Sequence, residues 1–214
     1  MRGGFRGCRR GGAMNSRVAA LYVDVARGPY VAMPGVECWG FATRDGRQLD
    51  AFAAQRDARS YDGPWPVVAH PPCGPWGRFA WHYKGGEGDK SCALHAVEQV
   101  RQWGGVLEHP SHSGLWEHLM LPGPGEPPDR YGGWTMEVEQ VRWGHPCVKA
   151  TWLYIVGCAA TPPLPPPREP THVMVRLKRN GNERPELRKA LRHITPPAFA
   201  RWLVDLASRC GEEP

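Results

Sequence analysis

The sequence predicts an α/β fold: a single Rossmann-like domain with a mainly parallel sheet, closed by a β-hairpin and a C-terminal helix. Two observations lead to this fold class. Short apolar runs that end at Gly or Pro alternate with stretches of helical periodicity, as in parallel sheets with crossover helices. The 214 residues, 41% of them apolar, suffice to bury one core of this kind. We expect the domain to span residues 17–210, after a basic, disordered tail at residues 1–16.

The first part of the domain has the pattern of two strands and a helix. Residues 18–25 (VAALYVDV) form an apolar run typical of a buried strand, and residues 36–41 supply a second strand. Residues 48–59 have moderate helical character, and a turn at residues 62–64 (DGP) follows.

The middle of the chain predicts a βαβ unit. Residues 66–69 (PVVA) favour a central parallel strand, which stops at His-Pro-Pro-Cys because prolines lack the donor that a sheet ladder needs. A flexible, glycine-rich link at residues 84–89 precedes a helix at residues 91–103, and residues 106–108 (VLE) form the next strand. Cys73 therefore lies just past the carboxyl end of a strand, where open α/β sheets place ligands.

The C-terminal part predicts a hairpin and a helix. Residues 137–156 are typical of two strands around a Gly-His-Pro turn, and residues 161–170 form a proline-rich linker. Residues 176–189 are charged and expected to be mobile. Thr195 is the expected cap of the last helix, with Pro196 at its first position.

Charge and cysteine content narrow the class of protein. The net charge of +6 is compatible with an anionic partner such as nucleic acid, although part of it lies in the tail. The seven cysteines are scattered without a CxxC pair, which favours free thiols and a reducing cytoplasm. No apolar stretch is long enough to predict a transmembrane helix, and the N-terminus lacks the apolar core of a secretion signal.

Cys73 is the candidate nucleophile, held by the rigid pair Pro71 and Pro72. Attack of a thiolate on C6 of cytosine makes C5 nucleophilic, provided that N3 is protonated as the ring gains electrons. This chemistry requires a carboxylic acid nearby. Glu108 ends the next predicted strand, and neighbouring parallel strands lie about 5 Å apart. The sequence therefore predicts that Cys73 and Glu108 face one crevice.

Three further residues are candidates for contact with the substrate. Arg142 and Lys149 flank the predicted hairpin, where cationic donors can bind a base carbonyl or a flanking phosphate. Trp76, in the loop after Cys73, is the best candidate for stacking on a base.

The order of these features resembles the DNA cytosine-C5 methyltransferases. Pro-Pro-Cys, a strand that ends in Glu, and Gln-x-Arg before a hairpin are similar to motifs IV, VI and VIII of that family. The resemblance is closest to short, phage-encoded methylase-like proteins that lack a target-recognition domain. The segments that carry it are VVAHPPC, VLEHP and WGHPCVKATWLYIVG.

The resemblance implies a class I methyltransferase-like fold and a role for each matched residue. Cys73 would be the nucleophile and Glu108 the contact to N3. Arg142 or Lys149 would contact the target base or the DNA backbone, and residues 71–72 would shape the nucleophile loop. His109 stands where the family usually has Asn after the Glu.

S-adenosylmethionine is the cofactor, and DNA the partner, that the resemblance implies. The family's Phe-x-Gly-x-Gly loop has no counterpart here, because residues 24–30 (DVARGPY) contain one glycine. If the cofactor binds, Asp24 or Asp57 is the candidate contact. The stretch between the hairpin and the last helix is too short for a full target-recognition domain. We therefore expect weak sequence readout, or a separate specificity partner.

Three alternatives stay open at the level of sequence. The first is a non-catalytic, DNA-binding protein with the methylase fold, and the second is another pyrimidine-modifying enzyme that acts on nucleotides. The third is a metal-dependent hydrolase, because several possible ligands fall at predicted loop positions: His70, His109, His112, His145 and Cys147.

Overall fold

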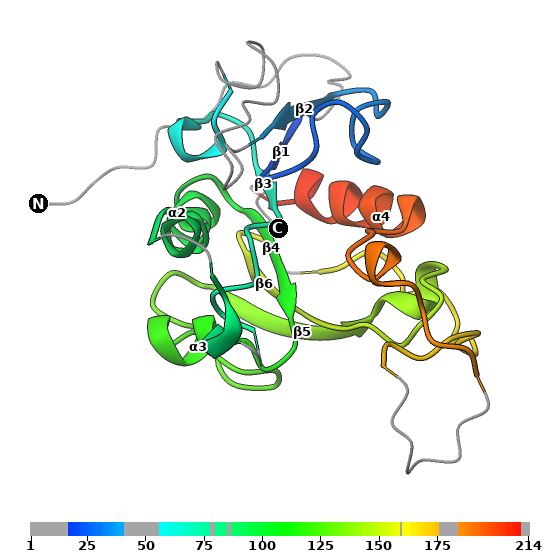
Figure 1. The fold of residues 1–214 in the computed structure, drawn as a ribbon. Coiled ribbons are helices and arrows are strands. Elements are labelled where there is room, and N and C mark those ends of the chain that lie inside the picture. The colour runs from blue at the N-terminus through cyan, green and yellow to red at the C-terminus, as the bar shows by residue number, and fades with distance from the viewer. Residues whose placement is uncertain are drawn as a thin grey trace, which may run out of the picture.

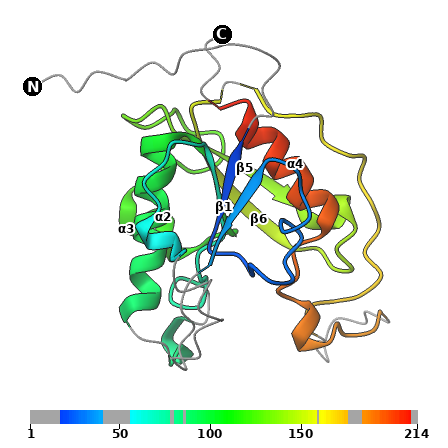
Figure 2. The ribbon, with the colours of Figure 1, turned by 90° about the horizontal axis from the view of Figure 1, so that it is seen from above.

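The described part of the protein consists of a six-stranded sheet with helices on both of its faces (Figures 1 and 2). The strand order is β2-β1-β3-β4-β6-β5. The structure is a computed structural model that describes residues 17–40, 56–77, 80–84, 87–158, 160–175 and 184–210.

The sheet is mostly parallel. β1 pairs in parallel with β2 and β3, and β3 pairs in parallel with β4. β6 is antiparallel to both of its neighbours, β4 and β5, so β5 points the same way as β1 to β4. The strand bounds are β1 Val18–Leu21, β2 Val36–Trp39, β3 Val67–Ala69, β4 Gly105–Pro110, β5 Trp134–Glu139 and β6 Ala150–Val156.

The helices form two outer layers. Figure 2 shows α2 and α3 on one face of the sheet and α4 on the other. The α-helices are α2 Glu87–Trp103, α3 Gly114–Leu119 and α4 Pro197–Ser208. Short 3-10 turns are η1 Ala58–Ser60, η2 Ala80–His82, η3 Gln140–Trp143 and η4 Lys189–Leu191.

Each face of the sheet has its own core, because successive side chains of a strand point to opposite sides. In β1, Val18 and Ala20 pack in the cluster that contains Phe199 of α4. Ala19 and Leu21 pack in the cluster that contains Val97 of α2. All four β1 side chains are fully buried, as a central parallel strand requires.

The expected mainly parallel sheet, closing hairpin and last helix are confirmed, and several boundaries were wrong. α2 begins at Glu87, not at residue 91. Asp89 lies in the first turn, where the helix dipole favours a carboxylate, and it accepts a hydrogen bond from Tyr83. β4 runs on to Pro110, because β6 lies alongside and pairs Pro110 with Thr151.

Two helix predictions also need correction. α3 was not expected; Ser113 caps it by accepting from the backbone N–H of Leu115 at 3.2 Å. α4 begins at Pro197, with Pro196 rather than Thr195 as its N-cap. The expected helix at residues 48–59 lies largely outside the described residues, as do the predicted tail and most of the charged segment 176–189.

The proline-rich segment 161–170 lies against the domain. The carbonyl oxygen of Pro163 accepts from the Trp202 indole at 3.1 Å, and that of Pro165 accepts from Arg142 at 2.9 Å. These bonds fix the segment to α4 and η3. Cys8 lies outside the described residues; the other six cysteines are free thiols, as expected. None of the helices in the described part combines the length and apolar character needed to span a membrane.

Candidate active site

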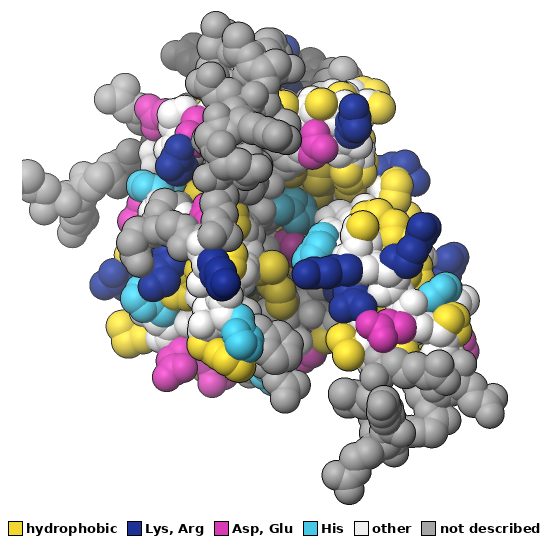
Figure 3. Space-filling model, in the orientation of Figure 1, with side chains coloured by type: hydrophobic (Ala, Val, Ile, Leu, Met, Phe, Trp, Pro, Cys, Tyr) yellow, Lys and Arg dark blue, Asp and Glu magenta, His cyan; other side chains and the backbone are white. Residues whose placement is uncertain are grey.

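The candidate site lies at the carboxyl ends of the parallel strands, which face the viewer in Figure 1. Cys73 follows β3, and Glu108 lies near the end of β4. Figure 3 shows a hollow on this face, with histidine and acidic side chains inside it. Lys and Arg side chains gather on the side of the hollow toward the segment before α4.

A tight turn fixes the nucleophile loop. The carbonyl oxygen of Cys73 accepts from the backbone N–H groups of Trp76 and Gly77, at 3.1 and 2.8 Å. A Cβ at Gly74 would lie 2.3 Å from the Tyr83 ring, so only glycine fits there without movement. Pro71 is buried and precedes this turn. The loop is thus a fixed platform for the thiol.

Trp76 ties the nucleophile loop to α3. Its carbonyl oxygen accepts from the backbone N–H of Gly114 at 2.8 Å and from the Ser113 hydroxyl at 3.3 Å. Its half-buried ring lies 5.0 Å from the His118 ring and packs on the α2 side of the sheet. Base stacking by Trp76 stays a prediction, and these contacts give the residue a positioning role.

Sheet register places His70 beside Glu108. Ala69 pairs with Leu107, so the residues that follow each of them are neighbours at the edge of the sheet. His70 Nδ1 lies 3.1 Å from Glu108 Oε2, with both side chains largely buried. The Gln140 amide donates to Glu108 Oε1 at 2.8 Å.

These contacts keep Glu108 charged in spite of its burial. Burial alone raises the pKa of a carboxyl group, but the hydrogen bond from His70, together with nearby Lys149, His70 and His109, lowers the pKa of Glu108 to about 2. Glu108 is therefore an oriented carboxylate near neutral pH.

Four polar residues complete this network, and sequence reasoning gave none of them this role. Tyr30, fully buried in the loop after β1, places its hydroxyl 2.6 Å from His70 Nε2. Gln140 also donates to the Thr151 hydroxyl at 2.9 Å, and neither of these two side chains is exposed. Gln140 belongs to the quoted Gln-x-Arg segment, and His70 to His-Pro-Pro-Cys. Thr151 belongs to the quoted WGHPCVKATWLYIVG segment, and Tyr30 ends the DVARGPY loop.

Two charged neighbours have opposite effects on the pKa of Cys73. Burial raises the pKa of its thiol, the Glu108 charge raises it further, and the Lys149 charge lowers it. Lys149 also lowers the pKa of Glu108. The structure thus places Cys73, Glu108 and Lys149 near enough for their charges to affect one another. The Arg142 guanidinium instead donates to the carbonyl oxygen of Pro165.

His109 is a buried neutral partner of this region. Burial lowers its pKa to about 4, although the Glu108 charge opposes that effect. Its Nδ1 lies 2.8 Å from the Ser113 hydroxyl. The histidine therefore links β4 to the cap of α3.

The two carboxylates named as candidate contacts to S-adenosylmethionine already have partners within the protein. Asp24 Oδ1 accepts from the backbone N–H groups of Ala26 and Arg27, at 2.9 and 3.0 Å, and closes its own loop. Asp57 uses both oxygens on Arg59, which lowers the pKa of Asp57. A methyl donor at this site would need other ligands.

A metal centre has no support in the described part of the chain. No three His, Cys, Asp or Glu side chains there converge in a way that could hold an ion. His145 and Cys147 interact locally, since His145 Nδ1 lies 3.1 Å from the backbone N–H of Cys147.

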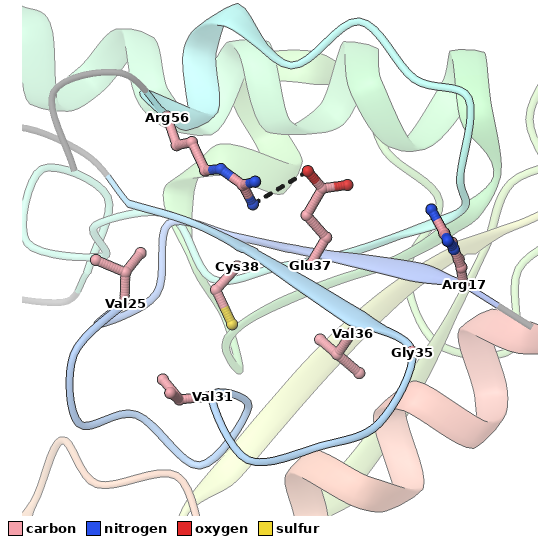
Figure 4. A pocket seen from close by; sticks show the side chains of 8 residues that line it. All are labelled: Arg17, Val25, Val31, Gly35, Val36, Glu37, Cys38 and Arg56. Carbon is pink, nitrogen blue, oxygen red and sulfur yellow. Dashed lines mark ion pairs between the residues drawn. The ribbon is translucent and has the colours of Figure 1, made fainter. Parts of the chain in front are cut away.

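A separate cleft of about 500 Å³ lies beside β2 (Figure 4). Its lining includes Val25, Val31 and Val36, and an ion pair of 3.1 Å between Arg56 and Glu37. None of its lining residues belongs to the network around Glu108.

A comparison of the chain with models of known protein families and with curated proteins finds no match.

Proposed function

We propose that this protein methylates C5 of cytosine in DNA through covalent addition of Cys73 to C6, in a class I methyltransferase-like fold. The observation that supports this most strongly is that Cys73 follows β3 and feels the charge of Glu108, a fixed carboxylate near the end of the adjacent parallel strand β4. This edge is where open α/β sheets bind ligands.

The proposed chemistry needs protons to move in two stages. The Cys73 thiol loses a proton as its sulfur bonds to C6, and N3 gains one as the ring electrons shift toward it; Glu108 as a carboxylate can accept the first proton and supply the second. Once C5 carries the methyl group, loss of the C5 proton to a base re-forms the C5–C6 double bond, the Cys73 sulfur leaves C6, and N3 gives up its proton to restore the thiol. Lys149 assists because its charge lowers the pKa of Cys73.

Gln140 favours cytosine over uracil as the base. Its Oε1 is buried and has no hydrogen-bond partner among the described residues. An unpaired buried acceptor is costly, and the exocyclic amino group of cytosine is a donor that would satisfy it. Uracil offers a carbonyl at that position instead.

DNA is the proposed macromolecular partner. The chain carries a net charge of +6, and basic side chains line one side of the hollow in Figure 3. A cytosine within a duplex would have to be flipped out to reach Cys73. S-adenosylmethionine, the donor that the sequence resemblance implies, would supply the methyl group.

The decisive experiment is nucleoside mass spectrometry of DNA from cells that lack their own cytosine-C5 methylation. Wild type is compared with Cys73→Ala and with Cys92→Ala, at a buried cysteine of α2 whose charged neighbours are Arg59, Asp57 and Asp89. We expect 5-methylcytosine with wild type and Cys92→Ala, and none with Cys73→Ala. Unmodified DNA in all three samples would refute DNA methylation.

A second candidate is a non-catalytic, DNA-binding protein of the same fold. The loop after β1 favours it, because Asp24 occupies loop N–H groups and a Cβ at Gly28 would lie 2.5 Å from the carbonyl oxygen of Asp24. Binding of labelled DNA without binding of S-adenosylmethionine would identify this function. Modification of free deoxycytidine monophosphate, with DNA left unchanged, would identify a nucleotide-modifying enzyme instead.

A further inference from the structure

The carboxylate of Glu108 is the centre of a hydrogen-bond chain that begins in the loop after β1. Tyr30 contacts His70 Nε2 at 2.6 Å, and His70 Nδ1 contacts Glu108 at 3.1 Å. Gln140 holds the other carboxylate oxygen at 2.8 Å and bonds Thr151. Side chains from separate segments thus converge on one acid.

We propose that Tyr30 and His70 form a positioning pair that keeps Glu108 charged and oriented for the reaction of Cys73. This inference deepens the proposed function, on which its catalytic meaning rests. It assigns roles to two residues that do not themselves touch the substrate.

The donor and acceptor capacities of the groups support the pair. A carboxylate only accepts, so His70 Nδ1 must carry the proton that it shares with Glu108. In the neutral ring Nε2 then has a lone pair, which the Tyr30 hydroxyl satisfies by donating. Burial, aided by the Glu108 charge, raises the pKa of Tyr30 well above its ordinary value, so this hydroxyl keeps its proton. Tyr30 therefore selects the tautomer of His70 that can donate to Glu108.

Side chains from several neighbouring segments affect the pKa of Glu108. His70 comes from the end of β3, His109 from β4, and Lys149 from the residues before β6; all three lower the pKa of Glu108. Cys73 and Tyr30 face the same charge, which raises the pKa of both groups. Cys73 can thus report on the charge of Glu108.

The test uses the thiol of the folded, full-length protein and needs no substrate. Iodoacetamide alkylation of Cys73 is followed by peptide mass spectrometry across pH. Without the His70 hydrogen bond, burial raises the pKa of Glu108, so the carboxyl group takes up a proton at a higher pH, and below that pH its charge no longer raises the pKa of Cys73. Glu108→Gln removes this charge at every pH and should move the alkylation midpoint about one pH unit lower. His70→Ala should raise the alkylation rate at acid pH, where Glu108 is protonated in the variant and charged in wild type.

Conservative variants separate positioning from misfolding. Tyr30→Phe removes one oxygen and should raise the alkylation rate at acid pH as His70→Ala does, whereas Tyr61→Phe, at another buried tyrosine outside this hydrogen-bond network, should not. His70→Gln, whose amide can still donate, should recover part of the wild-type profile. Wild-type alkylation rates at acid pH in both His70→Ala and Tyr30→Phe would overturn the proposal.

Methylation is a separate readout. If wild type methylates DNA, Tyr30→Phe should lower kcat with little change in the KM for DNA; an unchanged kcat would overturn the catalytic role of the pair. If wild type does not methylate DNA, the proposed function fails, and the alkylation profiles still decide whether the pair controls Glu108.

Discussion

At the scale of single residues, the site depends on how buried charges are compensated. Glu108 stays ionised because His70 and Gln140 donate to its two oxygens and Lys149 lies close by. His109, the next residue in the sequence, avoids a buried charge instead, because burial lowers its pKa to about 4 and keeps the ring neutral. Two neighbouring residues of one strand are therefore both deprotonated near neutral pH, and one is charged while the other is neutral.

The neutral state of His109 predicts a pH dependence of stability. Its pKa falls from 6.5 to about 4 on folding, so the unfolded chain binds the proton more tightly. Stability is therefore fully present above pH 6.5 and is lost as pH falls toward 4, by roughly 3 kcal/mol for this group. Urea unfolding at several pH values should show a smaller loss over this window for His109→Asn. Equal losses would contradict the assignment.

At the scale of elements, close backbone contacts hold in register the edge of the sheet that carries Cys73 and Glu108. β3 and β4 approach so closely at Gly105 that a Cβ there would lie 2.0 Å from the backbone oxygen of Val67, and the φ of Gly105 is +116°. Backbone cannot move aside as a flexible side chain can. This glycine is thus a requirement of the strand pair that carries Cys73 and Glu108.

Gly105→Ala should therefore cost more stability than a substitution at a glycine whose added Cβ would meet only ordinary contacts. We expect a loss of at least 1–3 kcal/mol, the usual range for overpacking, from clash and positive φ together. Gly123→Ala is the control, because its added Cβ would meet the nearest atom at an ordinary 3.4 Å. Denaturant midpoints of the two variants provide the comparison, and similar midpoints would argue against this account.

Local pattern was enough to predict some elements and not others. The apolar run at β3, the helical spacing of α2 and the β-prone β6 are each visible within one segment. α3 has six residues, too few for a clear periodicity, and its signal is the capping Ser113. β4 was predicted short because the effect of Pro110 was judged without knowledge of the neighbouring β6.

The candidate site was predictable only in part, because its key contacts depend on register between distant segments. Cys73 and Glu108 each end an apolar run, which made them visible. His70 and Glu108 meet because Ala69 pairs with Leu107, and Tyr30 reaches His70 through a loop conformation. A single sequence contains no direct record of either arrangement.

At the scale of the whole molecule, the hollow and a group of basic side chains lie on the same face (Figure 3). Figure 3 shows basic side chains beside the hollow, toward the segment that leads into α4. Arg188 and Lys189 of this segment are exposed. If DNA lies across this face, its phosphates would meet these charges.

Reversing both charges should weaken DNA binding and its dependence on salt. For the Arg188→Glu/Lys189→Glu variant we expect a lower affinity and a salt slope reduced by about 2. Arg130→Glu/Arg201→Glu, at two exposed positions on other parts of the surface, is the control of equal charge. Fluorescence anisotropy with a labelled duplex at several salt concentrations measures both. An equal loss in the two variants would point to net charge alone.

The chain of hydrogen bonds from Tyr30 to Thr151 makes the reactivity of Cys73 depend on whether the protein is fully folded. It exists only when the loop after β1, the end of β3, β4 and the hairpin are all assembled, so the surroundings of Cys73 are completed late in folding. In the native protein, burial and Glu108 restrain the thiol. A nascent or damaged copy loses that restraint and exposes an ordinary reactive cysteine. Electrophiles in the cell would then modify Cys73 faster in defective copies than in native copies.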